Sequence, residues 1–161
     1  MPAADIQLRR ALPQDAPAIA TIWQQGWRDG HLGNVPEELV AAREAESFAD
    51  RAAQRIGDTT VAVVQGHVAG FVMVVGDEVE QVYVARDHRG SGAADLLLDR
   101  AERQIRDAGH GTAWLAVVAG NTRARSFYQR RGWTDDGLFS YTAATGSGAV
   151  QVPCHRYVKQ L

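Results

Sequence analysis

The first sixty residues combine one short strand pattern with longer helical patterns. Alternating apolar positions predict a strand over residues 5–10. Apolar residues then recur at positions 16, 19, 22, 23, 26 and 27, which lie on one face of a helix. Residues 30–34 have the composition of a loop, and residues 36–56 predict further helix with a break. This part of the chain is therefore predicted to be mostly helical.

The pattern changes after Gly57. Three strand-like runs over residues 59–65, 68–76 and 78–85 are separated by short glycine-containing linkers, which predicts an antiparallel meander. The elements expected beyond it are a helix over 92–108, a buried strand over 112–118, a helix over 122–131, and a closing strand pair over 133–141 and 150–160 with a loop within 137–148. Because residues 78–118 form a strand–helix–strand unit, its two strands should be parallel.

A glycine-interrupted segment joins the last meander strand to the following helix. It reads Arg89-Gly90-Ser91-Gly92-Ala93-Ala94. Backbone N–H groups in such a turn and in the first turn of a helix have no partner within the helix, and the helix dipole favours an anion there. Arg89 adds a full positive charge. We therefore interpret the segment as a phosphate cradle, although a short glycine motif by itself is more often an ordinary loop.

A second segment supports this interpretation. Residues 121–133 predict a helix that ends at Gly132, in the position of a left-handed C-cap. Together the two segments resemble the GNAT superfamily of acetyl-CoA-dependent N-acetyltransferases. The family's coenzyme pattern, Gln/Arg-x-x-Gly-x-Gly/Ala, matches Arg89, Gly92 and Ala94. The matches to its second motif are Asn121, Ala124, Phe127, Tyr128, Gly132 and Trp133.

The resemblance is strongest over residues 78–133 and weak in the first sixty residues. It implies an α/β (α+β) fold with a mixed central sheet, an antiparallel N-terminal meander and helices on both faces. One parallel strand pair would be splayed around the coenzyme. Residues 1–161 are expected to form a single acetyltransferase domain, which agrees with the length of the chain.

The resemblance also implies which residues bind acetyl-CoA as the acetyl donor. The pyrophosphate would lie on the cradle of Arg89, Gly90, Ser91, Gly92, Ala93 and Ala94. Backbone groups of Val82 and Val84 would pair with the pantetheine arm, and the N–H of Val84 is a candidate oxyanion donor. Asn121 would hydrogen-bond the same arm, and Tyr128 would contact the coenzyme and protonate the departing thiolate. From the residues alone, Tyr128 is also a reasonable core aromatic and Asn121 an ordinary helix cap.

Attack of an amine on a thioester requires proton transfers. An alkylamine has a pKa of about 10.4 and a thiol about 8.5, so a general base and a general acid are both useful near neutral pH. Glu78 and Glu80 share strand parity with Val82 and are the candidate bases. We expect Glu80 to be the better candidate because it is nearer along the strand to the coenzyme-contacting positions. A solvated strand start is the alternative for Glu78.

Trp27 and His31 are candidates for the acceptor site. They lie at the end of the first predicted helix, in the region that covers the substrate cleft in the family. The expected acceptor is a primary amine of a small molecule or a peptide. The sequence does not identify it.

Composition excludes several other classes. The net charge is −2 without a basic stripe, so we expect no nucleic acid partner. No apolar run is long enough for a membrane span, and the single cysteine, Cys154, is expected to be buried in a cytoplasmic protein. The five histidines are not spaced for a metal site, so no metal is expected. The sequence leaves the oligomeric state undecided, and the resemblance suggests a homodimer because dimers are frequent in the family.

Two alternatives belong to other functional classes. One is a catalytically silent acyl-CoA-binding or regulatory module of the same fold, against which the retained Tyr128 argues. The other is a dinucleotide-binding oxidoreductase built on Gly90 and Gly92. That alternative fails because Asp95 stands where its fingerprint needs glycine.

Overall fold

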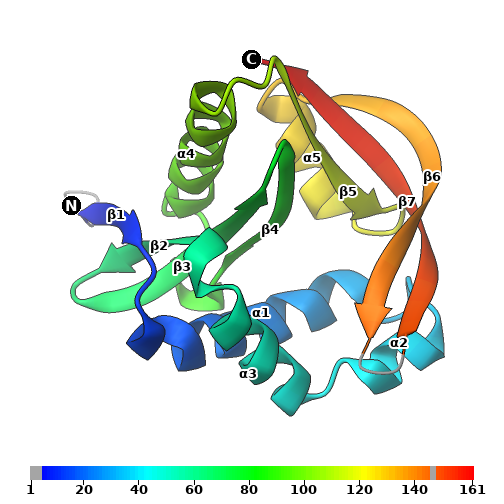
Figure 1. Cartoon of the computed structure of the whole chain (residues 1–161), viewed down its shortest axis with the longest axis horizontal. Helices are drawn as coiled ribbons and strands as arrows, with labels where there is room; N and C mark the ends of the chain where they lie inside the picture. Colours follow the sequence, from blue (N-terminus) through cyan, green and yellow to red (C-terminus); the bar gives the residue numbers. More distant parts are fainter. Residues whose placement is uncertain (1–4, 146–147) are drawn as a thin grey trace.

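The computed structural model describes residues 5–145 and 148–161. In this part of the chain, seven strands form one mixed sheet with the order β1-β2-β3-β4-β5-β7-β6 (Figure 1). The strands are β1 Ile6–Arg10, β2 Thr59–Val64, β3 His67–Val75, β4 Glu78–Val84, β5 Thr112–Val118, β6 Thr134–Thr145 and β7 Gly148–Gln160. Strands β1 to β4 form an antiparallel meander, and β4 pairs with β5 in parallel, which confirms the predicted fold class.

Helices cover both faces of the sheet and enclose two separate apolar cores. The helices are α1 Ala16–His31, α2 Glu37–Ala42, α3 Ala45–Gln54, α4 Ala93–Asp107 and α5 Thr122–Arg130. One core contains Trp23, Phe48 and Phe71 and lies between the sheet and α1 and α3. The other contains Leu97 and Leu98 and lies between the sheet and α4. Within the described residues, no helix is long and apolar enough to cross a membrane.

Strands β4 and β5 touch at one end and then diverge (Figure 1). Their ladder is limited to the pair Glu78 and Trp114. On the other side of β4, the N–H of Ala85 donates to the Ala69 carbonyl at 2.8 Å. Because hydrogen-bonded and non-bonded pairs alternate in an antiparallel ladder, the backbone groups of Val82 and Val84 point away from β3, toward the gap left by β5.

A β-bulge in β4 corrects one expectation about the site. Met73 pairs with Gln81 and Val74 with Val79, so Glu80 is an extra residue without a partner on β3. Val82 consequently packs in the α4 core, whereas Glu78 shares the opposite face with Gln81. The prediction that Glu78, Glu80 and Val82 project to one face is wrong, because strand parity does not survive the extra residue.

The closing hairpin is longer than predicted. Strand β6 continues to Thr145, through most of the expected loop at 137–148, and pairs with β7 as far as Gly148. Gly137, the first residue of the range expected to contain the loop, has φ of +104° and donates its N–H to Asp135 Oδ1 at 2.9 Å. The register shifts at this point, so the glycine marks a bulge within a strand and not the hairpin turn. Residues 146–147 of the expected loop lie outside the described residues.

Candidate active site

A cavity of about 350 Å³ lies between the end of β4, the start of α4 and α5. Every position to which the resemblance assigns coenzyme binding borders it except Ser91. The bordering residues with an expected role are Val82, Val84, Arg89, Gly90, Gly92, Ala93, Ala94, Asn121 and Tyr128. Segments separated by some forty residues in the sequence therefore meet around one space.

The glycine loop presents open backbone to this cavity. Gly90 has φ of +79° and Gly92 has φ of +91°, a backbone conformation that favours glycine. A Cβ atom at either position would have no atom within 4 Å, so packing does not require these glycines. Within the described residues, the N–H groups of Gly90, Gly92 and Ala94 have no protein acceptor, whereas those of the residues between them donate to nearby oxygens. The loop can therefore offer alternate N–H groups to an anion.

Arg89 is held at the mouth of the cavity by an aspartate that the sequence did not suggest. Asp29 at the end of α1 accepts hydrogen bonds from Arg89 Nη2 at 2.8 Å and from Arg86 Nη2 at 2.6 Å. These two guanidinium groups lower the pKa of Asp29 to about 2. A second, polar cavity of about 390 Å³ adjoins it and also includes Arg89, Asn121 and Arg123 in its lining. Arg89 donates to Asp29 through Nη2, so the other N–H groups of its guanidinium can donate to an anion in either cavity.

Tyr128 lies near the C-terminal end of α5, is mostly buried and borders the cavity. Its ring packs against Phe127, Trp133 and Tyr157 at centroid distances of 5.3, 6.1 and 6.2 Å. Burial raises the pKa of the Tyr128 hydroxyl, so it holds its proton at neutral pH. Among the described residues the hydroxyl has no hydrogen-bond partner. The residue is thus a core aromatic with a protonated phenol, and it borders the cavity.

The sequence comparison decides the family. The model of the acetyltransferase (GNAT) family matches residues 17–133, which is more than half of the chain. The chain belongs to this family. A streptothricin acetyltransferase of Streptomyces lavendulae is 29% identical over 157 residues, which cover 90% of this chain and 75% of that protein. This GNAT chain is therefore an acyltransferase enzyme by its family.

Solved GNAT structures have the same fold. A GCN5-related N-acetyltransferase from Rhodopseudomonas palustris aligns with a TM-score of 0.76 and 23% identity, over 100% of this chain and 99% of that one. The PaiA N-acetyltransferase from Thermoplasma acidophilum, in complex with coenzyme A, aligns with a TM-score of 0.72 and 16% identity. That alignment covers 98% of this chain and 99% of PaiA. At these identities the likeness concerns the fold.

Glu78 and Glu80 have different surroundings in this GNAT chain. Both carboxylate oxygens of Glu80 accept hydrogen bonds from Arg55, at 2.6 and 2.8 Å. Glu78 accepts one hydrogen bond from the Tyr141 hydroxyl at 3.0 Å, and burial raises the pKa of its carboxyl. A carboxylate with a raised pKa and a free oxygen is the better proton acceptor. These surroundings favour Glu78 over Glu80, the reverse of the order expected from strand position, and neither carboxylate is in the lining of the two cavities.

Tyr83 is a cavity residue that sequence reasoning missed. Its ring lies against Gly26 of α1, where a Cβ atom would be 2.3 Å from Tyr83 Cδ1. It borders the same cavity as Tyr128, and burial raises the pKa of its hydroxyl, with a further contribution from Tyr128. In the sequence Tyr83 is one more apolar position of a strand. The signal that could have found it is a glycine inside the apolar face of a helix.

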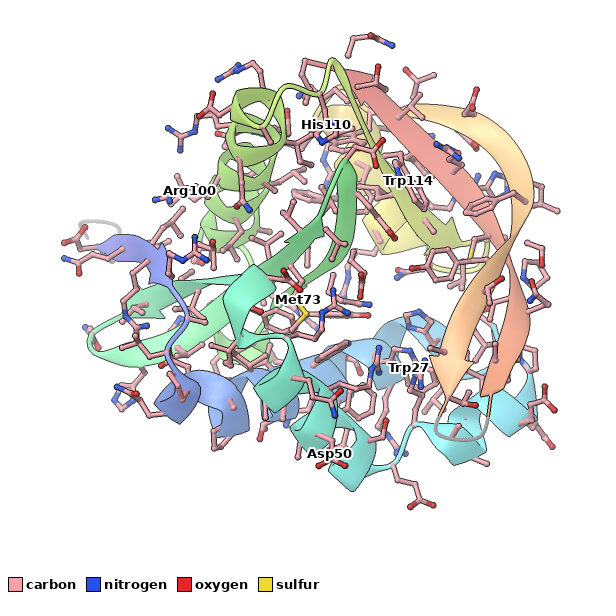
Figure 2. All side chains as sticks on the ribbon, in the orientation of Figure 1. Trp27, Asp50, Met73, Arg100, His110 and Trp114 are labelled. Carbon is pink, nitrogen blue, oxygen red and sulfur yellow. The ribbon has the colours of Figure 1, made fainter. Side chains whose placement is uncertain are left out.

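Trp27 lies in the core on the α1 side of the sheet (Figure 2), and His31 is one turn further along the same helix. Trp27 is 5% exposed and packs in the core, with its ring stacked on that of His31 at 4.8 Å. His31 Nδ1 donates to the Trp27 carbonyl at 2.9 Å, and burial lowers the pKa of the imidazole to about 4. Neither residue is in the lining of the two cavities, so an acceptor role for them stays a prediction.

The described residues contain no group of three or more His, Cys, Asp or Glu side chains that could hold a metal ion. Cys154 is buried on β7, and burial raises the pKa of its thiol to about 11. A thiol that keeps its proton at neutral pH is a poor nucleophile. Its surroundings are those of a structural cysteine.

Proposed function

We propose that this GNAT chain transfers an acetyl group from acetyl-CoA to a primary amine of a small molecule or peptide. The observation that carries the proposal is the single cavity shared by the glycine loop and the Tyr128 phenol. One end of this space suits an anion, because Gly90, Gly92 and Ala94 present unpaired N–H groups there. The other end supplies a proton donor. This combination fits the transfer of an acyl group from a phosphate-bearing thioester.

The residues fit acetyl-CoA as the donor on three structural grounds. The open faces of Gly90 and Gly92 allow a pyrophosphate to approach the backbone, and Arg89 adds charge beside it. The backbone groups of Val82 and Val84 face the gap between β4 and β5, where they can pair with the amides of a pantetheine arm. The similar PaiA structure contains coenzyme A. We therefore assign the donor site to this cavity.

The residues also supply the proton transfers of a direct attack. Glu78 accepts a proton from the ammonium form of the acceptor, directly or through water. The amine nitrogen then bonds to the acetyl carbon while the carbon–sulfur bond breaks. Tyr128 gives its proton to the departing thiolate. The proton that the acylated nitrogen still carries leaves to solvent, and solvent also reprotonates the Tyr128 phenolate. Burial disfavours the phenolate, so the protonated phenol is the form present at the start of each turnover.

Free-thiol release with a broad panel of amines tests the proposal, together with calorimetric titration of acetyl-CoA. Tyr128→Phe removes only the hydroxyl and keeps the packed ring, so it should bind acetyl-CoA normally and lose turnover by a factor of about 10²–10⁴. Phe127→Leu is a matched control that alters the neighbouring packing but no proton donor. Binding without turnover of any amine would favour the silent acyl-CoA-binding module, and absence of acetyl-CoA binding would refute the site itself.

A further inference from the structure

Two arginines on the α1 and α3 side of the sheet have no acidic partner among the described side chains, which do not include those of residues 45–46. Arg43 ends α2 and is only 8% exposed. Arg51, on α3, has a buried Nη1 atom without a hydrogen bond. Among those described side chains neither arginine forms an ion pair. Arg55 shows the usual solution, because one turn after Arg51 it is neutralised by the two oxygens of Glu80.

These guanidinium groups act on Tyr83, which borders the donor cavity. The Arg51 guanidinium carbon is 4.2 Å from the centroid of the Trp23 ring and 5.7 Å from that of Phe48, which fixes the side chain against the core. The charges of Arg43 and Arg51 both reach Tyr83, where they lower the pKa of a phenol that borders the donor cavity. They belong to α2 and α3, which with α1 lie on the face of the sheet opposite to α4.

Two partly buried like charges are unfavourable without a counter-charge. Each guanidinium loses hydration, and Arg43 and Arg51 also repel each other, since the charge of Arg43 lowers the pKa of Arg51. Trp23 offers Arg51 a cation–π contact, but a ring quadrupole does not neutralise a full charge. His31 supplies no counter-charge, because burial lowers the pKa of its imidazole and keeps the ring neutral. An anionic ligand group would resolve this arrangement.

We infer that Arg43 and Arg51 bind a carboxylate of the acceptor, which makes the acceptor an amine that also carries an acidic group, such as an amino acid. This inference rests on the proposed acetyl transfer. The coenzyme phosphates have their own site at the glycine loop, so the unpaired guanidiniums are available to the other substrate. A planar guanidinium matches the two oxygens of a carboxylate. Glu78, which lies on the same face of the sheet, would then attract the amino end.

Turnover of matched acceptors gives the first test. Amino acids are compared with their amides, in which the carboxylate is replaced by a neutral group of similar size. The wild type should prefer the acid by about 10- to 100-fold in kcat/KM, the range expected for hydrogen bonds to a charged group. Arg43→Met should remove this preference while keeping turnover of the amides. Arg103→Met, an exposed arginine on α4, is the control and should keep the preference.

Direct binding separates this inference from the proposed function. N-acetyl amino acids and their amides are titrated calorimetrically into the protein saturated with coenzyme A, so no turnover is needed. Acid-specific binding that Arg43→Met and Arg51→Met abolish supports the carboxylate site, even if no amine is acetylated. Equal affinity for acids and amides in the wild type overturns it, whatever the turnover. Preferred binding of a phosphorylated amine over the carboxylic acid would also overturn it.

The melting temperature of Arg43→Met separates a ligand-binding role from a structural role, because the two roles predict shifts in opposite directions. Because Arg43 lacks a counter-charge, Arg43→Met should leave the melting temperature of the ligand-free protein unchanged or raise it. A clear fall in melting temperature without loss of acid preference would make Arg43 a structural residue and overturn its assignment.

Discussion

The contact between Gly26 and Tyr83 gives the sharpest prediction about packing at the site. A Cβ atom added at Gly26 would lie 2.3 Å from Tyr83 Cδ1 and 2.9 Å from Cε1, whereas carbon atoms pack at about 3.5–4 Å. The ring must therefore move by more than an ångström, and it borders the donor cavity. Overpacking of this kind costs about 1–3 kcal/mol. Alanine in a helix interior is favoured over glycine by about 0.5–1 kcal/mol, which offsets part of that cost.

Gly26→Ala should therefore reduce the free energy of unfolding by up to about 2 kcal/mol, which for a chain of this size lowers the melting temperature by about 2–4 °C per kcal/mol. The sign should reverse when the ring is absent. In a Tyr83→Ala background, Gly26→Ala should stabilise the protein by about 0.5–1 kcal/mol, because only the helix preference remains. The coupling energy between the two positions is then about 1–3 kcal/mol.

Chemical denaturation of the four proteins of this double-mutant cycle measures the coupling. Gly57→Ala is the control, because a Cβ there meets no atom within 4 Å, and it should show no coupling to Tyr83→Ala. Additive effects of Gly26→Ala and Tyr83→Ala, within about 0.5 kcal/mol, would show that the helix and the ring do not press on each other and would refute the reasoning.

Three further predictions concern charge. Gly92→Asp should abolish calorimetric binding of acetyl-CoA in a folded protein, because it puts a carboxylate at the cradle, whereas Gly111→Asp at an open position should bind normally. Glu78→Gln should remove the acid limb from the pH dependence of turnover. In the wild type that limb should lie at higher pH than is usual for a glutamate, because burial raises the pKa of Glu78. Glu80→Gln should keep the limb, and the opposite result would restore Glu80 as the base. Asp29 has a pKa lowered to about 2, so its ion pairs stabilise the fold above pH about 4, and this contribution is lost as the pH falls toward 2. Asp29→Asn should therefore weaken the pH dependence of the denaturation midpoint between about pH 4 and 2. An unchanged pH dependence would contradict the ion pairs.

The sequence by itself determined the local parts of the donor site. The glycine loop could be found because positive φ angles, unpaired N–H groups and a helix start all depend on neighbours along the chain. The strand–helix–strand unit from β4 to β5 followed in the same way, from hydrophobic spacing and the handedness of such connections. Tyr128 could be placed only by the resemblance, since its spacing fits a core aromatic equally well.

Tertiary structure alone decided which side chains meet across the chain. The bulge at Glu80 arises from the register of β3 against β4, and it turns Glu78 away from the face of Val82. Arg55 thereby reaches Glu80 from 25 residues away, and Asp29 meets Arg86 from 57 residues away. Such pairs depend on packing between distant elements, which no local pattern encodes. For the same reason, the burial of the Arg43 guanidinium without an acidic partner among the described side chains became visible only in the folded structure.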